Sequence, residues 1–195
     1  MENLYQYGLY ILIVIVVVLG LYLLRLRAEL SSIKRSKEKV IQEAYFNPIS
    51  NLPNKKNIKY VFDEQIGRTL RHNRSFTVLA VKINNYQEVK KGSVKLANKL
   101  IQIASDIIIQ DTRGEDLAAH VDDDVLIILF NEYLEGDNYH IVLDRLKDSF
   151  KKSKELQHEG IEFEISMGIS TYPHDGKDSD SLIEKAISQA VSKQF

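Results

Sequence analysis

The pattern of apolar and polar positions divides the chain near residue 45. Residues 8–24 contain no charged side chain, and an extension back to Leu4 brings the apolar segment to about 21 residues, enough for a helix across a ~30 Å hydrocarbon layer. We therefore expect a transmembrane helix within residues 1–25. A cleaved signal peptide is the alternative, but the segment has no basic n-region and no small-x-small site before Arg25.

Charge on the two sides of this segment predicts its orientation. Basic residues follow it closely, whereas the charged side chain of the short N-terminal segment is Glu2; these basic residues are Arg25, Arg27, Lys34, Arg35, Lys37 and Lys39. The positive-inside rule then predicts a single-pass protein of the cell inner membrane, with an extracytoplasmic N-terminus and a cytoplasmic domain. The same cluster suits anionic lipid, at about 1 kcal/mol per residue.

Residues 26–46 predict a helical stalk. Its apolar positions step by four and three, with Lys37 interrupting the series, at Leu26, Leu30, Ile33, Val40 and Ala44. This heptad seam predicts a parallel homodimer of two stalks. The alternative is a single amphipathic helix that lies on lipid or on the domain.

From residue 47 the chain alternates helical and strand patterns. Pro48 and Pro53 break the stalk helix, and Asn54 caps a new helix with the apolar face Ile58, Val61, Phe62, Ile66 and Leu70. The segments that follow are a strand at 76–83, a helix at 96–109, strands at 117–121 and 125–130, a helix at 139–150, a strand at 161–169 and a helix at 182–191. This order predicts an α+β domain at 47–195, with a ferredoxin-like sheet covered by helices.

Composition narrows the function classes. The 26 basic and 27 acidic side chains nearly cancel, to a net charge of -1, which argues against a nucleic-acid binder steered by bulk charge. No cysteine is present, so disulfides and thiolate sites are excluded. The five histidines show no HxxH or HExxH spacing, so we expect no metal site among them.

The most unusual polar feature is a run of three acids, Asp122 to Asp124, between the two adjacent apolar strands. So short a connection predicts a β-hairpin. Three neighbouring carboxylates repel one another unless a cation, a basic partner or water screens them. A solvated turn and a charged site are both compatible with the spacing.

Three segments resemble the GGDEF domains, the diguanylate cyclase family. The segment NPISNLPNKK resembles the family's entry motif and keeps Leu52, Pro53 and Asn54; SMGISTYPHDG resembles its SIGIAxYPxDG segment. Arg113 and Asp116 match an RxxD motif, five residues before Asp122-Asp123-Asp124-Val125-Leu126, which falls where the GGDEF signature lies. The resemblance covers about residues 45 to 195 and implies the nucleotidyl-cyclase type of the ferredoxin-like fold.

The resemblance also implies an altered active site. Lys82 stands where the family has a metal-binding Asp, Val125 replaces the signature's Glu, and only Asp124 keeps the signature's residue type. We therefore expect no catalytic residue, no metal and no cofactor at the degenerate positions, which are Lys82, Asp122, Asp123, Asp124, Val125 and Leu126.

In the family, RxxD at this offset binds the product c-di-GMP away from catalysis. The resemblance thus implies c-di-GMP as a possible ligand of Arg113 and Asp116, whereas the pair is otherwise a surface contact that opens a strand. We expect a membrane-anchored, inactive signalling or scaffolding module with an unidentified protein partner. The alternatives are a c-di-GMP receptor and a weakly active cyclase that relies on Asp124.

Overall fold

The computed structural model describes the backbone of residues 2–72, 74–130, 139–154 and 160–192, and the side chains of 18–72, 74–130, 140–154 and 160–191. The chain divides into two compact units, residues 1–44 and 45–195. The first is formed by helix α1 (Glu2–Tyr45), whose apolar positions Leu26, Leu30, Ile33 and Val40 are exposed within the unit.

The predicted membrane span is not supported by this structure. Within the part of the chain that is described, no helix is both long enough and apolar enough to cross a membrane. Most side chains of the predicted span, up to residue 17, lie outside the described side chains. The span at residues 8–24 stays a prediction.

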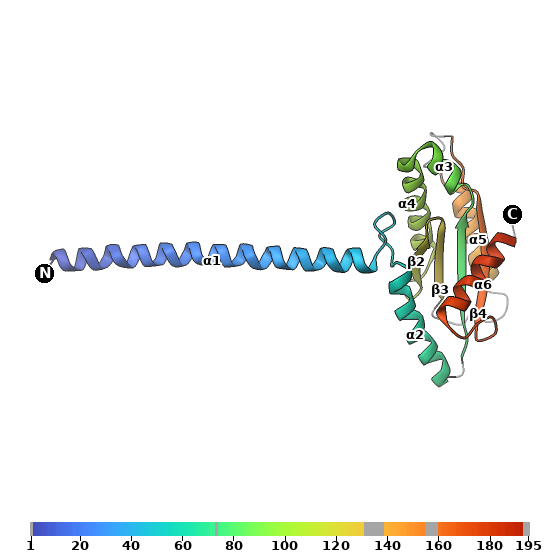
Figure 1. Cartoon of the computed structure of the whole chain (residues 1–195), viewed down its shortest axis with the longest axis horizontal. Coiled ribbons are helices and arrows are strands. Elements are labelled where there is room, and N and C mark those ends of the chain that lie inside the picture. The colour runs from blue at the N-terminus through green and yellow to red at the C-terminus, as the bar shows by residue number, and fades with distance from the viewer. Residues whose placement is uncertain (1, 73, 131–138, 155–159, 193–195) are drawn as a thin grey trace. The chain divides into compact units, whose positions relative to one another are not determined.

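The described residues of the second unit form one four-stranded antiparallel sheet with helices on both faces (Figure 1). Its elements are α2 (Lys55–His72), β1 (Phe76–Ile83), α3 (Tyr86–Gly92), α4 (Val94–Asp111), β2 (Leu117–Asp122), β3 (Val125–Phe130), α5 (Tyr139–Lys152), β4 (Ile165–Tyr172) and α6 (Ser179–Ser192). The strand order β2-β3-β1-β4 confirms the predicted ferredoxin-like plan.

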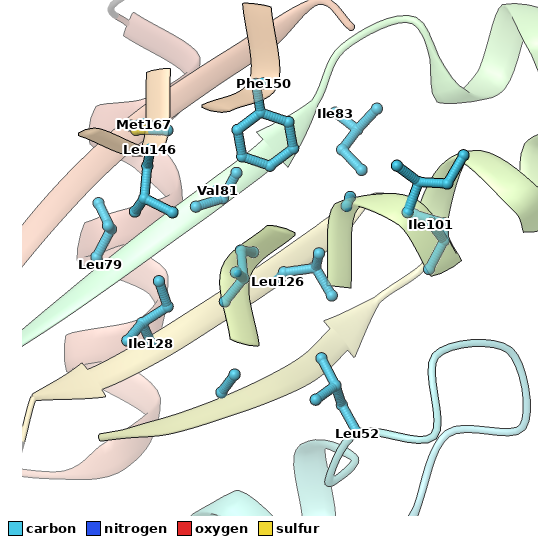
Figure 2. Packing of buried hydrophobic residues seen from close by; sticks show 14 of the residues in the cluster. Leu52, Leu79, Val81, Ile83, Ile101, Leu126, Ile128, Leu146, Phe150 and Met167 are labelled. Carbon is cyan, nitrogen blue, oxygen red and sulfur yellow. The ribbon is translucent and has the colours of Figure 1, made fainter. Parts of the chain in front are cut away.

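Alternation along β1 supplies both halves of the core. Leu79, Val81 and Ile83 pack with residues of α4 and α5, as Figure 2 shows for Ile101, Leu146 and Phe150. The alternate residues Phe76, Val78 and Ala80 pack with α2 and α6. Since successive side chains of a strand point to opposite faces, one strand with both faces buried holds the three layers together.

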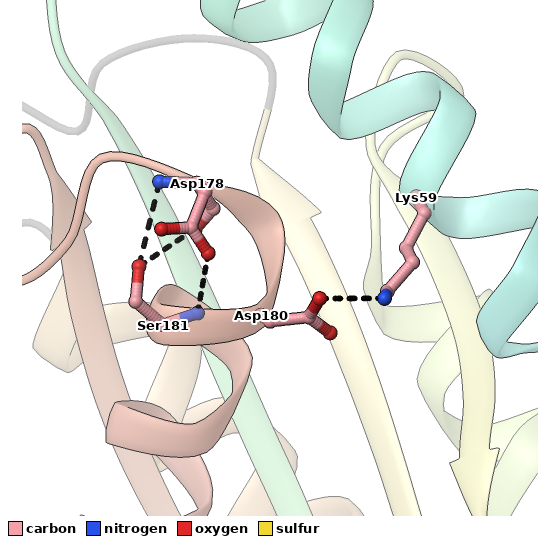
Figure 3. A network of polar contacts seen from close by, with 4 residues as sticks. All are labelled: Lys59, Asp178, Asp180 and Ser181. Carbon is pink, nitrogen blue, oxygen red and sulfur yellow. Dashed lines mark hydrogen bonds and ion pairs between the residues drawn. The ribbon is translucent and has the colours of Figure 1, made fainter.

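The layer of α2 and α6 is fixed by packing and by charge. Lys59 Nζ of α2 lies 2.6 Å from Asp180 Oδ2 of α6, and Asp178 Oδ1 accepts a 2.9 Å hydrogen bond from Ser181 N in the first turn of α6 (Figure 3). Backbone-to-backbone approach is close at Gly168, where an added Cβ would lie 2.1 Å from Ala186 O. α6 therefore lies directly on β4, without an intervening side chain at this point.

Two details differ from the sequence predictions. β4 begins four residues later and ends three residues later than predicted, because it pairs along the whole of β1, from Phe76–Tyr172 to Ile83–Ile165. On α2, Leu70 is exposed, and the buried stripe instead continues from Ile58 and Phe62 through Gln65 and Thr69.

The predicted cap of α2 is confirmed by a 3.0 Å hydrogen bond from Asn57 N to Asn54 Oδ1.

A buried histidine ties the segment before α2 to the hairpin. His120 of β2 is 2% exposed; its backbone N–H donates to Pro53 O at 2.8 Å, and its ring lies between Ser50 Oγ and Asp123 O. Asp123 O can only accept, so Nε2 carries the proton and Nδ1 of the neutral ring accepts from Ser50. Burial lowers the pKa of His120 below 6.5.

This burial predicts a stability change in mildly acidic solution. In the unfolded chain His120 gains a proton near its ordinary pKa of about 6.5, whereas in the fold it does so at lower pH. The free energy of unfolding should therefore be constant above that value and fall as pH decreases below it, until the folded pKa is passed. Urea unfolding followed by circular dichroism between pH 8 and pH 5 measures this slope.

His120→Asn is the control for that slope. The variant should be less stable at pH 8, by about 1–3 kcal/mol, because it loses buried hydrogen bonds, but its stability should change less between pH 8 and pH 5. Asp123 and Asp178, whose pKa values are lowered from 3.8, titrate below this range. Equal slopes for the two proteins would show that His120 does not cause the effect.

Candidate functional site: the hairpin tip and the end of β1

The hairpin of β2 and β3 is confirmed, with a tighter turn than the sequence predicted. Asp122 pairs with Val125, so the connection is reduced to Asp123 and Asp124. A register shift between His120 and Asp122 places an irregularity just before the turn. Asp122 Oδ1 accepts a 2.8 Å hydrogen bond from Asp123 N, which holds the first carboxylate against the backbone of the turn.

An ion pair joins the hairpin to the end of β1. Lys82 is opposite Val125 in the sheet, and Ile83 N donates to Asp124 O at 2.9 Å, so the lysine side chain starts beside the turn. Its Nζ lies 2.6 Å from Asp124 Oδ2, and the two side chains are only 27% and 13% exposed. Partial burial reduces screening by water, so this contact is stronger than one between exposed side chains.

A second lysine neutralises a second acid. Lys90 Nζ of α3 lies 2.7 Å from Asp123 Oδ2 and 5.3 Å from the centre of the Tyr86 ring. The hydrogen bond from Lys90 lowers the pKa of Asp123, and the same bond raises that of Lys90. The structure therefore supplies the basic partners that three adjacent carboxylates require, one lysine from β1 and one from α3.

The remaining signature positions face the core. Val125 is 2% exposed and Leu126 is fully buried, and they pack in the clusters on opposite faces of the sheet. Neither side chain has an atom that binds a cation or phosphate. Of the six degenerate positions, the structure thus brings Lys82, Asp123 and Asp124 into one charged cluster and assigns Val125 and Leu126 to packing.

Arg113 and Asp116 meet in a turn at the other end of β2. Asp116 Oδ2 accepts a 3.1 Å hydrogen bond from Arg113 N, and Asp116 N donates to Arg113 O at 3.0 Å. The Arg113 side chain is 67% exposed, and its guanidinium lies 3.7 Å from Glu115 Oε1. The two RxxD residues are therefore close in space, but they belong to a different part of the domain from the Lys82–Asp124 pair.

The sequence did not predict the contact between Lys90 and Asp123 or the short helix α3. The signal that was available is the spacing of Tyr86 and Lys90, which are four residues apart and therefore neighbours on one helical face. In the described part of the chain no group of three or more histidine, aspartate or glutamate residues is arranged to hold a metal ion.

Solved structures share this fold at low sequence identity. The coiled coil and GGDEF domain of DgcB from Caulobacter crescentus, in complex with c-di-GMP, has a TM-score of 0.71 and 15% identity, covering 89% of this chain and 93% of that chain. A GGDEF-only form of PA1120 (TpbB or YfiN) from Pseudomonas aeruginosa has a TM-score of 0.69 and 15% identity, covering 77% and 91% of the two chains. These similarities establish the fold.

Sequence comparison is consistent with the fold. The bifunctional diguanylate cyclase/cyclic di-GMP phosphodiesterase MucR of Pseudomonas aeruginosa is 23% identical over 157 residues, which are 80% of this chain. The chain spans only 23% of the length of that relative. A family profile described as "Diguanylate cyclase, GGDEF domain" matches residues 44–193. The chain therefore belongs to the GGDEF domain family.

Proposed function

We propose that this protein is a membrane-anchored GGDEF domain that makes no c-di-GMP and acts as a signalling and scaffolding module at the inner membrane. The observation that carries the proposal is the contact between Lys82 and Asp124. A cyclase of this family needs a carboxylate at the position of Lys82 to bind Mg²⁺, and here an ammonium group lies 2.6 Å from the one acid that keeps its family identity.

The residues present do not fit the metal ion that the family implies. Phosphoryl transfer depends on cations that bridge phosphate oxygens and neutralise developing charge. Lys82 repels a cation, and its ion pair uses Asp124, while Val125 is a buried apolar side chain. Lys90 and Asp123 are likewise paired with each other. The cluster is a set of internal ion pairs, which supports a structural role for the former catalytic hairpin.

Anchoring and dimerisation complete the proposal. Residues 8–24 would cross the membrane, and the stalk would pair two chains in parallel. The stalk positions Leu26, Leu30, Ile33 and Val40 are apolar and between 41% and 62% exposed, so pairing along this seam would bury apolar surface. A dimer at the membrane would present two copies of the domain to a protein partner that remains unidentified.

c-di-GMP as a ligand of Arg113 and Asp116 is the second candidate function. The observation that favours it is the turn that holds the two residues together with an exposed guanidinium. Guanidinium groups bind phosphate oxygens with two parallel hydrogen bonds, and carboxylates accept N–H groups of guanine. In this role the protein would be a receptor whose ligand changes the pairing of the stalks.

The loss of catalysis predicts a specific response to magnesium. Purified protein with GTP and Mg²⁺ should yield no c-di-GMP. Lys82→Asp should destabilise the domain by on the order of 3 kcal/mol, because it breaks a partly buried pair and adds a like charge. About 10 mM Mg²⁺ should recover part of that loss in Lys82→Asp and none in Lys82→Met, which lacks the added carboxylate. Thermal unfolding with and without Mg²⁺ measures both.

The opposite results are equally specific. Product formation that disappears in Asp124→Ala would establish a weakly active cyclase and overturn the proposal. Stabilisation of the unmodified protein by Mg²⁺ alone would show that the ion pair does not occupy the cation position.

The proposed stalk dimer predicts a pattern of disulfide cross-links. The chain contains no cysteine, so single cysteines report on one position each. Leu30→Cys lies on the predicted seam and should form a covalent dimer under mild oxidation in membranes, since facing seam residues bring their Cα atoms within about 7 Å. Ser32→Cys, on the other side of the helix, should not. Equal cross-linking of both variants would argue against a defined seam.

The receptor function predicts saturable c-di-GMP binding by calorimetry. Arg113→Ala should weaken that binding by about 1.5–3 kcal/mol, the usual value of a hydrogen bond to a charged group. Arg68→Ala is the control because it removes a guanidinium on a different element, α2, where Arg68 pairs with Glu64. If the unmodified protein gives no heat with c-di-GMP, this second function is wrong and the scaffold proposal is unaffected.

A further inference from the structure

A cavity of about 380 Å³ opens beside the start of β4. Its lining comes from the residue that follows β1, from α5, and from residues at and just before the start of β4. The volume lies within the range of small-molecule sites, which is about 300–1,000 Å³. None of the degenerate signature positions lines this cavity, nor do Arg113 and Asp116.

The apolar side of the cavity is aromatic. Phe150 and Phe163 form an edge-to-face pair with ring centres 5.1 Å apart and an angle of 71° between the planes. Phe150 and Met167 are 3% and 4% exposed, so their positions are fixed by the core, whereas Phe163 is half-buried and closes the pair. Flat rings pack well against aromatic edges and thioether sulfur. The ligand body that fits this side is a small aromatic ring.

The polar side of the cavity is mainly basic. Lys147 and Lys151 are four residues apart on α5, so both project from the same face of the helix, and both line the cavity. Ammonium groups that line one cavity can bind an anionic group of a ligand through charge-assisted hydrogen bonds. Glu164 also lines the cavity and offsets one of the two charges, which leaves a net positive charge.

Asn84 adds a directed donor. Its carboxamide oxygen accepts a 3.0 Å hydrogen bond from Ser166 Oγ, and its backbone N–H donates to Glu164 O at 2.7 Å. The NH₂ group is then the part of the side chain that can bind an acceptor on a ligand. The backbone bond also fixes Asn84 and Glu164 relative to each other, so the donor and the carboxylate are held at one edge of the cavity.

We propose that this cavity binds a small aromatic anion, a flat ring that carries a carboxylate or a phosphate. The ring packs on Phe150, Phe163 and Met167, the anionic group lies between Lys147 and Lys151, and an acceptor on the ring takes a hydrogen bond from Asn84. Metabolic aromatic acids and mononucleotides share this chemistry. The inference is independent of whether the hairpin is catalytic.

Met167 allows a direct test in the full-length protein. The chain has two methionines, so selective ¹³C-methyl labelling gives one signal from the cavity and one from Met1. In zwitterionic lipid nanodiscs, titration with 4-hydroxybenzoate or with uridine 5′-monophosphate should shift the Met167 signal saturably and leave that of Met1 unchanged. Uridine, which lacks the anionic group, should bind at least about tenfold more weakly than its monophosphate.

The two anionic probes distinguish the sources of the ligand. Saturation by the benzoate alone identifies an aromatic acid, and saturation by the monophosphate alone identifies a nucleotide. If neither probe moves the Met167 signal, or if both shift it linearly without saturation, the proposal is wrong.

A matched pair of charge reversals tests the role of the lysines. Lys151→Glu should weaken binding of the effective probe by about tenfold or more, because it places a carboxylate beside the anionic group. Lys152→Glu makes the same change in net charge at a neighbouring residue that does not line the cavity and is 79% exposed. It should leave binding unchanged, and an equal effect of both variants would overturn the proposed site. Circular dichroism checks that both remain folded.

Discussion

β1 is paired on both edges and covered on both faces, and this constraint determines where charged side chains can lie in the domain. β3 and β4 pair with it along almost its whole length, and its residues from 76 to 81 are buried without exception. Thr77 is a polar residue within that stretch and is 4% exposed, whereas a charged side chain there would be placed inside the core, away from water. The first position where a charged residue is accommodated is Lys82, where the strand approaches the edge of the core and the hairpin turn lies beside it.

The ammonium group of Lys82 is partly buried, and the carboxylate of Asp124 beside it balances its charge. Three adjacent carboxylates at one turn repel one another and destabilise the fold unless a positively charged group lies close to them. A bound cation is one solution and a lysine from the neighbouring strand is another, and the chain has the second. Lys90 repeats this solution for Asp123 from α3. Internal ion pairs therefore hold the carboxylates of Asp123 and Asp124 at the hairpin turn.

Periodicity and turn chemistry predicted the strands, the long helices and the hairpin, because these depend on local patterns of apolar residues. The limits of β4 depended on the length of its partner β1, and no local pattern contains that information. The burial of Thr69 in place of Leu70 likewise follows from where α2 meets the sheet. The contact of Lys90 with Asp123 joins residues 33 positions apart, so the spacing of Tyr86 and Lys90 on one face of α3 could indicate the helix but not the partner of Lys90.

The end of β1 also explains why two charged features occur in the same part of the domain. Lys82 and Asn84 are separated by one buried residue, Ile83. The side chain of Lys82 contacts the hairpin, and that of Asn84 lines the cavity beside β4. The backbone of this segment is held on both sides, by Ile83 N to Asp124 O and by Asn84 N to Glu164 O. A ligand that tightens the cavity around Asn84 would thus act on a backbone segment that also carries the Lys82–Asp124 pair.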